Sequence, residues 1–331
     1  MDERLARTAR ATFLASTAVL LLFTGCTKDI TVDLPETEPK VVVEGTIETG
    51  GPPLVILTRT QSFFAPTSVA SIAASFISDA VVTVNDGFNT YQLDRICSND
   101  LPDSLLAAAA QATGIDVGLL QAANICVWTK LNDELNGVEG RTYRLNVETM
   151  GRTVTATTTI PIGVALDSLW FKLALQQPND DSLGFVYARL TDPDTLGNAY
   201  RWFARRINKG SDGEPKDGRF IPPFFSVFED KYVNALSFDL FFDRGSEPFS
   251  SAIDDNNEES GYFKRDDTVV VKFASIGVAE YRFYNSLANN VATQGDLFSN
   301  PSNVRSNVQG GIGVWAGLAT RFDTVVCVPV P

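Results

Sequence analysis

The chain has 331 residues, enough for two domains of ordinary size, each with its own hydrophobic core. Hydrophobic residues make up 44% of it, with 22 Phe and 4 Trp, and this composition excludes a disordered chain. The 40 acidic and 27 basic side chains give a formal net charge of -13, which repels phosphate backbones and argues against nucleic acid as a partner. Histidine is absent, which excludes Ser-His-Asp and Cys-His catalysis and His-ligated zinc.

Residues 1–25 have the features of a lipoprotein signal peptide. Three arginines come first, and the apolar run 11–23 that follows is shorter than the roughly 20 residues needed to span a membrane. Thr24-Gly25-Cys26 resembles the lipobox of bacterial lipoproteins, with Phe23 where that pattern prefers Leu. The resemblance implies cleavage before Cys26 and acylation of its sulfur, so that palmitate-type chains hold the protein to a membrane. The alternative is an ordinary signal peptide followed by an incidental cysteine.

Residues 26–39 are polar, contain two prolines and show no periodicity, as expected of a tether. Thr27 is not the aspartate that retains many lipoproteins at an inner membrane, so we expect the outer membrane. Lys28-Asp29 partly resembles the export tag of surface lipoproteins in Bacteroidota-type bacteria. This match is too short to separate the cell surface from the periplasmic face.

Two of the remaining cysteines bracket a segment with helical patterns. Cys97 and Cys126 flank residues 98–125, in which Asp103–Ala112 and Asp116–Ala123 are predicted helices. A disulfide between them suits an exported protein and would add roughly 3–4 kcal/mol of stability on the chain-entropy model. It would fasten a helical insertion onto a sheet. Two buried thiols are the alternative.

Residues 40–161 are predicted to form one β-sandwich of immunoglobulin or fibronectin type, from which the insertion 98–125 protrudes. A strong turn signal at 85–87 joins two of its strands. Its predicted strands, which show alternating or continuous apolar patterns, are Val41–Ile47, Leu54–Leu57, Ala80–Val84, Tyr91–Leu93, Thr142–Glu148 and Val154–Ile160.

Residues 162–331 are predicted to form a second β-rich domain with one helix, Val278–Val291, whose apolar residues fall on one stripe. We expect Cys327 to be a buried strand residue. The predicted strands are Leu169–Leu175, Phe185–Leu190, Tyr200–Ile207, Leu236–Phe242, Thr268–Ile276 and a bent, glycine-rich strand within 304–320. The predicted fold class is therefore mainly β.

Six Asp-Ser or Asp-Thr pairs are each followed by an aliphatic residue, which resembles the O-glycosylation acceptor that Bacteroidota-type bacteria use on exported proteins. The acceptors would be Ser104, Ser168, Ser182, Thr195, Thr268 and Thr324. The alternative is structural, because such pairs commonly precede strands and cap helices.

Two acidic loops are weak candidates for calcium, a cation that prefers oxygen ligands. The candidate ligands are Asp192, Asp194, Asp254 and Asp255, although neither loop has the spacing of an EF-hand. A solvated acidic surface is the alternative. We expect no cofactor.

Aromatic and cationic residues gather in the second half of the chain. Phenylalanines are dense within 220–249, where they either pack in the core or form a docking surface. Arg201, Arg205 and Arg206 stand beside aromatic residues. They either meet a carboxylate or a sugar, or pair with acidic residues along a strand face.

Several segments together resemble a domain-of-unknown-function family of outer-membrane lipoproteins from Bacteroidota-type bacteria. The resemblance implies a lipoprotein often associated with TonB-dependent receptors, and it brings no catalytic residue. We therefore expect a non-enzymatic accessory, for binding or assembly, of a TonB-dependent transport system. An envelope glycan-processing hydrolase with paired carboxylates and a surface adhesion module are the alternatives. The segments are the lipobox, 41–45, 79–87, 140–145, 281–287 and 300–313.

Overall fold

The computed structural model describes residues 38–62, 68–115, 117–175, 182–210, 213–245, 259, 261–293 and 303–329. Residues 39–331 pack as one unit whose described part is mainly β, as predicted. The predicted signal peptide and Cys26 lie outside the described residues. Among the helices that are described, none is long and apolar enough to cross a membrane.

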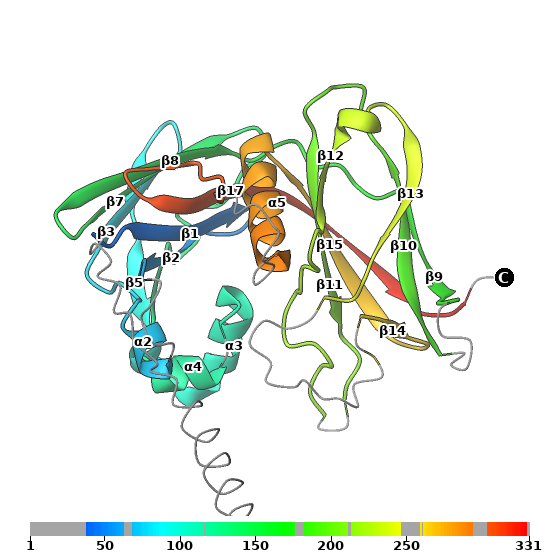
Figure 1. Cartoon of the computed structure of the whole chain (residues 1–331), viewed down its shortest axis with the longest axis horizontal. Helices are drawn as coiled ribbons and strands as arrows, with labels where there is room; N and C mark the ends of the chain where they lie inside the picture. Colours follow the sequence, from blue (N-terminus) through cyan, green and yellow to red (C-terminus); the bar gives the residue numbers. More distant parts are fainter. Residues whose placement is uncertain are drawn as a thin grey trace, which may run out of the picture. The chain divides into compact units, whose positions relative to one another are not determined.

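The largest sheet, called the central sheet below, has eight strands from both halves of the chain (Figure 1). In sheet order these are β12 (Val227–Glu229), β11 (Ala199–Arg206), β15 (Thr268–Ile276), β17 (Ile312–Val326), β1 (Val41–Glu48), β2 (Leu54–Arg59), β6 (Cys126–Thr129) and β5 (Asp94–Cys97). Strands β1 and β17 pair in parallel, with Val43 beside Gly313. The central sheet thus contains strands from both sides of the predicted domain boundary at residue 161. That boundary remains a prediction.

Two smaller sheets complete the β structure. The five-stranded sheet consists of β16 (Val308–Gln309), β8 (Arg152–Thr159), β7 (Thr142–Thr149), β3 (Val81–Asn85) and β4 (Thr90–Gln92). The four-stranded sheet consists of β13 (Ser237–Phe242), β10 (Leu183–Thr191), β14 (Phe263–Lys264) and β9 (Ser168–Leu173). Strand β15 matches its predicted range, and the other predicted strands are confirmed with shifted ends.

Both smaller sheets pack against the same face of the central sheet, one toward each end. Side chains alternate along a strand, and the register of β15 with β17 puts Phe273 and Ala319 on that face. Ala319 belongs to the core under the five-stranded sheet, with Tyr143 and Trp315. Phe273 belongs to the core under the four-stranded sheet, with Trp202. Two sandwiches therefore share one sheet.

The opposite face of the central sheet carries the helices. Helix α5 (Val278–Ala292) lies across it (Figure 1). Its Tyr281 and Tyr284 pack against the hydrophobic cluster that contains Ala274 and Val314 of the sheet. The prediction of Val278–Val291 as a helix is confirmed to within one residue at its end.

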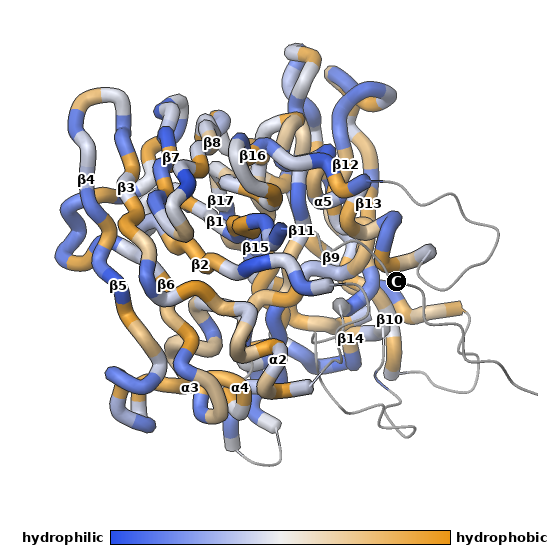
Figure 2. Tube along the Cα trace, turned by 60° about the vertical axis from the view of Figure 1, so that its left-hand side comes forward, coloured by the Kyte–Doolittle hydropathy of each residue, from blue (hydrophilic) through white to orange (hydrophobic). Residues whose placement is uncertain are grey.

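The insertion contains the turn η2 (Ser98–Asp100) and helices α3 (Asp103–Thr113) and α4 (Val117–Ala122). Helix α2 (Val69–Ala73) and the turn η3 (Asp230–Tyr232) lie elsewhere in the chain. Helix α3 forms because it is alanine-rich, with an acidic residue in its first turn and Gly114 in a left-handed conformation at its end. The predicted disulfide is confirmed: Cys97 and Cys126 pair across β5 and β6 at the base of the insertion. Figure 2 shows that β2, β6 and the helices α3 and α4 are all rich in hydrophobic residues.

Candidate functional site

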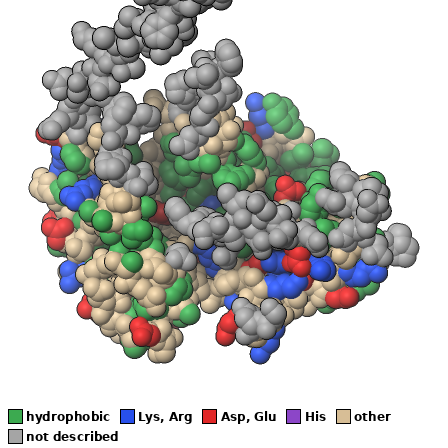
Figure 3. Space-filling model, turned by 60° about the horizontal axis from the view of Figure 1, so that its bottom comes forward, with side chains coloured by type: hydrophobic (Ala, Val, Ile, Leu, Met, Phe, Trp, Pro, Cys, Tyr) green, Lys and Arg blue, Asp and Glu red, His purple; other side chains and the backbone are tan. Residues whose placement is uncertain are grey.

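A cavity of about 550 Å³ lies between the helical insertion and the helix-bearing face of the central sheet. The sheet contributes Thr46, Glu48, Leu54, Ile96, Val127 and Lys272 to its lining. The insertion contributes Leu101, Leu105, Ala108, Ala109, Ala112 and Leu120. On the side of the molecule that carries the insertion, Figure 3 shows hydrophobic side chains gathered in a hollow.

Strand alternation explains which residues of β1 face the cavity. Val43 and Ile47 are buried in the core of the first sandwich. Because successive side chains of a strand point to opposite faces, Glu44, Thr46 and Glu48 point to the other side. Thr46 and Glu48 therefore line the cavity with polar groups, although the other lining residues of the sheet are mostly apolar.

The wall on helix α3 is open because its side chains are small. Ala108, Ala109 and Ala112 face the cavity, whereas Leu106 points away into the small core of the insertion. The sequence predicted this helix but did not show that its alanines border a cavity. The Cys97–Cys126 disulfide fixes the position of this wall against the sheet.

One end of the cavity is charged. Lys272 Nζ lies 2.7 Å from Glu48 Oε1, and only 12% of the lysine side chain is exposed. The same amine lies over the ring of Phe203, 4.5 Å from its centroid, and over that of Phe220 at 5.5 Å. This ammonium is therefore neutralised by a carboxylate and held by two aromatic faces.

Arg201 shares the Phe203 ring with Lys272, and its charge acts on the Glu44 carboxyl. Its guanidinium carbon is 3.6 Å from the centroid of the Tyr284 ring and 4.7 Å from that of Phe203. Its Nε atom is buried and has no hydrogen-bond partner in the described part of the chain. Arg201 is thus a cation held in place by aromatic rings.

Arg219 and Glu44 add further charges near Arg201, although neither of them lines the cavity. Arg219 Nη1 donates to the carbonyl of Gly114, at the end of helix α3. Glu44 is solvent-accessible but lies in a recess where protein atoms displace much of its hydration. This desolvation raises the pKa of the Glu44 carboxyl, while the positive charges of Arg201 and Arg219 act in the opposite direction.

The other two arginines of the predicted cluster behave as strand-face ion pairs and polar contacts. Arg206 is buried, and its guanidinium lies 2.8 Å from Asp217 and 2.5 Å from Glu259. Arg205 donates to the Asp217 carbonyl at 3.1 Å. None of the three arginines is among the residues that line the cavity.

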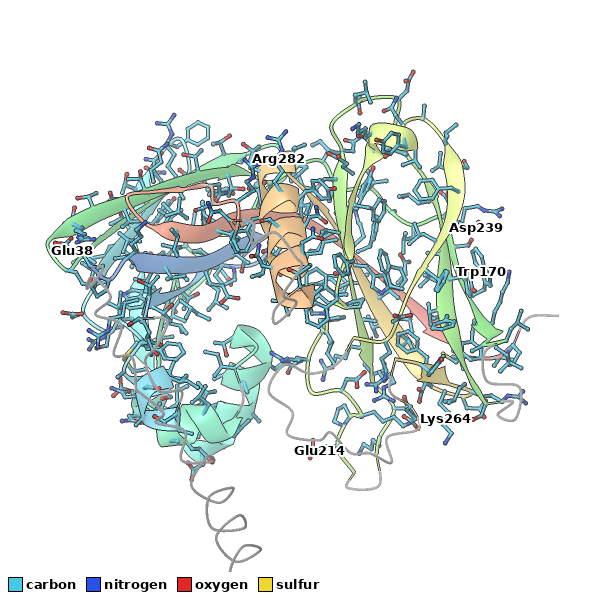
Figure 4. All side chains as sticks on the ribbon, viewed as in Figure 1. Glu38, Trp170, Glu214, Asp239, Lys264 and Arg282 are labelled. Carbon is cyan, nitrogen blue, oxygen red and sulfur yellow. A yellow bond between two sulfur atoms is a disulfide. The ribbon has the colours of Figure 1, made fainter. Side chains whose placement is uncertain are left out.

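The dense phenylalanines divide between core and surface. Phe228, Phe238 and Phe242 pack in the core of the second sandwich, whereas Phe224 is 67% exposed and Phe241 is 47% exposed. Trp170 and Asp239 lie on the outer face of the four-stranded sheet (Figure 4), where Arg189 pairs with Asp239 at 2.7 Å.

Of the four predicted calcium ligands, only Asp192 and Asp194 lie within the described residues. Asp192 is buried and accepts hydrogen bonds from Tyr200 Oη at 2.5 Å and from the Ala235 amide at 3.3 Å. Asp194 is exposed, and Asp254 and Asp255 lie outside the described residues. Within the described ranges, no three acidic, histidine or cysteine side chains are placed to hold a metal ion.

The six predicted glycosylation acceptors differ in accessibility. Those that are exposed are Ser104, Ser168, Thr195 and Thr324, and those that are half-buried are Ser182 and Thr268. Their modification remains a prediction. Cys327 is free and is buried as predicted, but it directly follows β17 and does not lie within a strand.

Residues 27–321 match a family model described as "Domain of unknown function (DUF4249)". The chain belongs to this family. The match confirms the predicted membership of a domain-of-unknown-function family, and the DUF4249 domain includes every residue that lines the cavity. A search of curated proteins found no match.

Proposed function

We propose that this DUF4249 protein is a lipid-anchored accessory of a TonB-dependent transport system at the outer membrane, and that it binds a small, largely apolar molecule. The cavity between the insertion and the central sheet carries this proposal. Its volume of about 550 Å³ lies within the roughly 300–1,000 Å³ of typical ligand pockets. Apolar side chains with a few placed polar groups are also the usual lining of such pockets.

The carboxylates of the cavity favour binding over glycan hydrolysis. A glycosidase needs two carboxyl groups roughly 5–10 Å apart. Glu44 and Glu48 share one face of β1, but four residues of a strand place their Cα atoms about 13 Å apart. In addition, Glu48 is paired with Lys272. Neither arrangement supplies the acid and the base that hydrolysis requires.

Membrane attachment and the transport partner are supported by the sequence. A chain with a net charge of -13 gains nothing from anionic lipid headgroups, so acyl chains on Cys26 would supply the attachment. The chain resembles lipoproteins that accompany TonB-dependent receptors. We therefore propose that such a receptor accepts the ligand from this protein.

Filling the cavity tests the binding proposal. The protein is exported with Cys26→Ser, which removes the need for detergent, and is titrated with the neutral apolar dye Nile red. We expect saturable binding that Ala109→Trp weakens by roughly tenfold or more, because the indole would occupy the cavity. The matched control is Ala107→Trp, on the exposed side of the same helix, which should bind as the parent does. Absence of saturable binding, or equal binding by both variants, would contradict the proposal.

A second experiment tests attachment and partner. Mass spectrometry of the protein from native membranes should find acyl chains on Cys26, and Cys26→Ser should release the protein from the membrane fraction. Affinity purification from solubilised outer membranes should recover a TonB-dependent receptor. An unmodified sulfur on Cys26, or recovery of the lipoprotein alone, counts against this part of the proposal.

A further inference from the structure

We infer that the ion pair of Lys272 and Glu48 selects the ligand, and that the cavity takes a neutral amphiphile whose polar head both donates and accepts a hydrogen bond. Long-chain alcohols and primary amides have this chemistry. The inference rests on the proposed binding function and specifies the class of ligand. It is carried by the position of the ion pair, by the balance of its charges and by its capacity for further hydrogen bonds.

The ion pair belongs to the lining of the cavity. Glu48 comes from β1 and Lys272 from β15, and both side chains are among those that border the empty space. The rings of Phe203 and Phe220 lie beside the ammonium group and help to hold it in place. A ligand therefore meets a fixed polar group in a wall that is otherwise mostly apolar.

The two charges of the ion pair neutralise each other. Lys272 Nζ lies 2.7 Å from Glu48 Oε1, so an ionised ligand head would be attracted by one partner and repelled by the other. Such a head would also lose its hydration on entering the cavity, which costs far more for an ion than for a neutral group. The ion pair therefore disfavours carboxylates and ammonium ions alike.

Both partners of the ion pair can still bond to a ligand. Their mutual hydrogen bond uses one oxygen of Glu48 and one of the three ammonium N–H groups of Lys272. The second carboxylate oxygen can accept a hydrogen bond, and the ammonium can donate another. A hydroxyl or a primary amide carries a donor and an acceptor together, so its head can bond to both partners.

The apolar part of the lining suits the remainder of such a molecule. Leu54 and Val127 of the central sheet line the same cavity as Leu101 and Leu105 of the insertion. An alkyl chain between these side chains leaves water, and each methylene that it buries adds affinity through the hydrophobic effect. The head and the chain of an amphiphile therefore each find a matching part of the cavity.

The first test compares heads on chains of similar length, with Nile red as the displaced probe and the Cys26→Ser protein as the host. The ligands are decan-1-ol and its isomer nonyl methyl ether, which accepts a hydrogen bond but donates none. We expect the alcohol to displace the dye at a concentration roughly tenfold or more below that of the ether, because a hydrogen bond to a charged group adds about that much affinity. This comparison uses the parent protein alone, so it decides the question even if a variant fails to fold.

The second test removes each partner of the ion pair in turn. Glu48→Gln leaves the ammonium of Lys272 without its carboxylate, so decanoate should displace the dye at a concentration roughly tenfold or more below that needed with the parent. Lys272→Met leaves Glu48 without its ammonium and should give the same gain for decylammonium. General damage to the cavity would weaken every ligand and would not produce these opposite gains.

The matched control is the pair of Arg189 and Asp239, whose atoms are also 2.7 Å apart and which does not line the cavity. Asp239→Asn and Arg189→Met should keep the preferences of the parent.

Two results would overturn the ligand class and leave the binding function standing, provided that Nile red still binds saturably. One is equal displacement by the alcohol and its ether isomer. The other is tighter binding of decanoate or decylammonium than of decan-1-ol by the parent. Failure of the parent protein to bind Nile red saturably would instead contradict the proposed function.

Discussion

The hydroxyl of Thr158 on β8 donates a hydrogen bond to Glu280 Oε1 on helix α5 at 2.6 Å, and both side chains are buried. The same hydroxyl accepts from the Gly317 amide of β17 at 2.9 Å. One threonine thus joins the five-stranded sheet, the central sheet and the helix that covers it. Desolvation raises the pKa of the Glu280 carboxyl, and the Thr158 hydrogen bond acts in the opposite direction.

Replacement of Glu280 by Gln should therefore change how stability depends on pH. Because the folded pKa of Glu280 is raised, its contribution to stability is complete below the unfolded pKa of about 4.3 and is lost as pH rises through the folded pKa. Because glutamine cannot ionise, the Glu280→Gln variant should lose less stability than the parent protein as the pH rises through the folded pKa of Glu280. Urea unfolding at several pH values measures the difference, with the exposed Glu148→Gln as control. Parallel curves for parent and Glu280→Gln would contradict the prediction.

Glu139 should show the opposite dependence. Its hydrogen bond with Arg321, with Oε1 and Nη1 2.6 Å apart, and that from the Gly163 amide at 3.0 Å lower the pKa of the carboxyl. A lowered pKa means that the stabilisation is present above the unfolded pKa of about 4.3 and is lost as pH falls through the folded pKa. Glu139→Gln should cost roughly 1–3 kcal/mol at neutral pH and little in acid. An equal cost at both pH values would show that charge is not the cause.

Reduction of the Cys97–Cys126 disulfide should lower the free energy of unfolding by roughly 3–4 kcal/mol. The paired variant Cys97→Ser and Cys126→Ser should lose the same amount and should also weaken dye binding, because the insertion forms one wall of the cavity. Chemical unfolding with and without reductant gives the measurement. Cys327→Ala should keep its sensitivity to reductant, since that thiol is free and buried. A parent protein unaffected by reductant would refute the role of the bridge.

Gly313 should tolerate no side chain. Its φ of +116° is unfavourable for other residues, and a methyl group would overlap the carbonyl of Val43, its neighbour in the β1–β17 pair. Gly313→Ala should destabilise the protein by roughly 1–3 kcal/mol or more. Gly218→Ala, where a methyl group meets nothing, is the matched control. Similar melting temperatures for the two variants would disprove the close approach.

Local patterns predicted much of the fold. Strict alternation identified β7 and β8, and their inward residues Tyr143, Leu145 and Val154 are buried as that pattern requires. The two cysteines that flank the insertion made it predictable, because a disulfide between them closes the intervening residues into a loop. The strands β5 and β6 beside these cysteines were missed, since each is four residues long and carries little periodicity.

The candidate site was harder to predict. The sequence shows that Arg201 has aromatic neighbours. It does not show that Arg201 contacts the ring of Tyr284, on a helix far along the chain, whereas Arg206 pairs with Asp217. The alanines of α3 predict a helix, but the neighbouring sequence does not indicate which of them line the cavity. Both features depend on contacts between segments far apart in the chain, which patterns of neighbouring residues do not encode.

The parallel partnership of the first and last long strands has a consequence for biogenesis. Val43 is synthesised early, whereas the strand beside it begins at Ile312 and is synthesised much later. Until then β1 and β15 each present an open edge, which invites association with other chains. Folding of such distant partners is slow, because the loop between them must close first. A truncation before residue 312 would therefore leave these edges unpaired and the chain prone to aggregation.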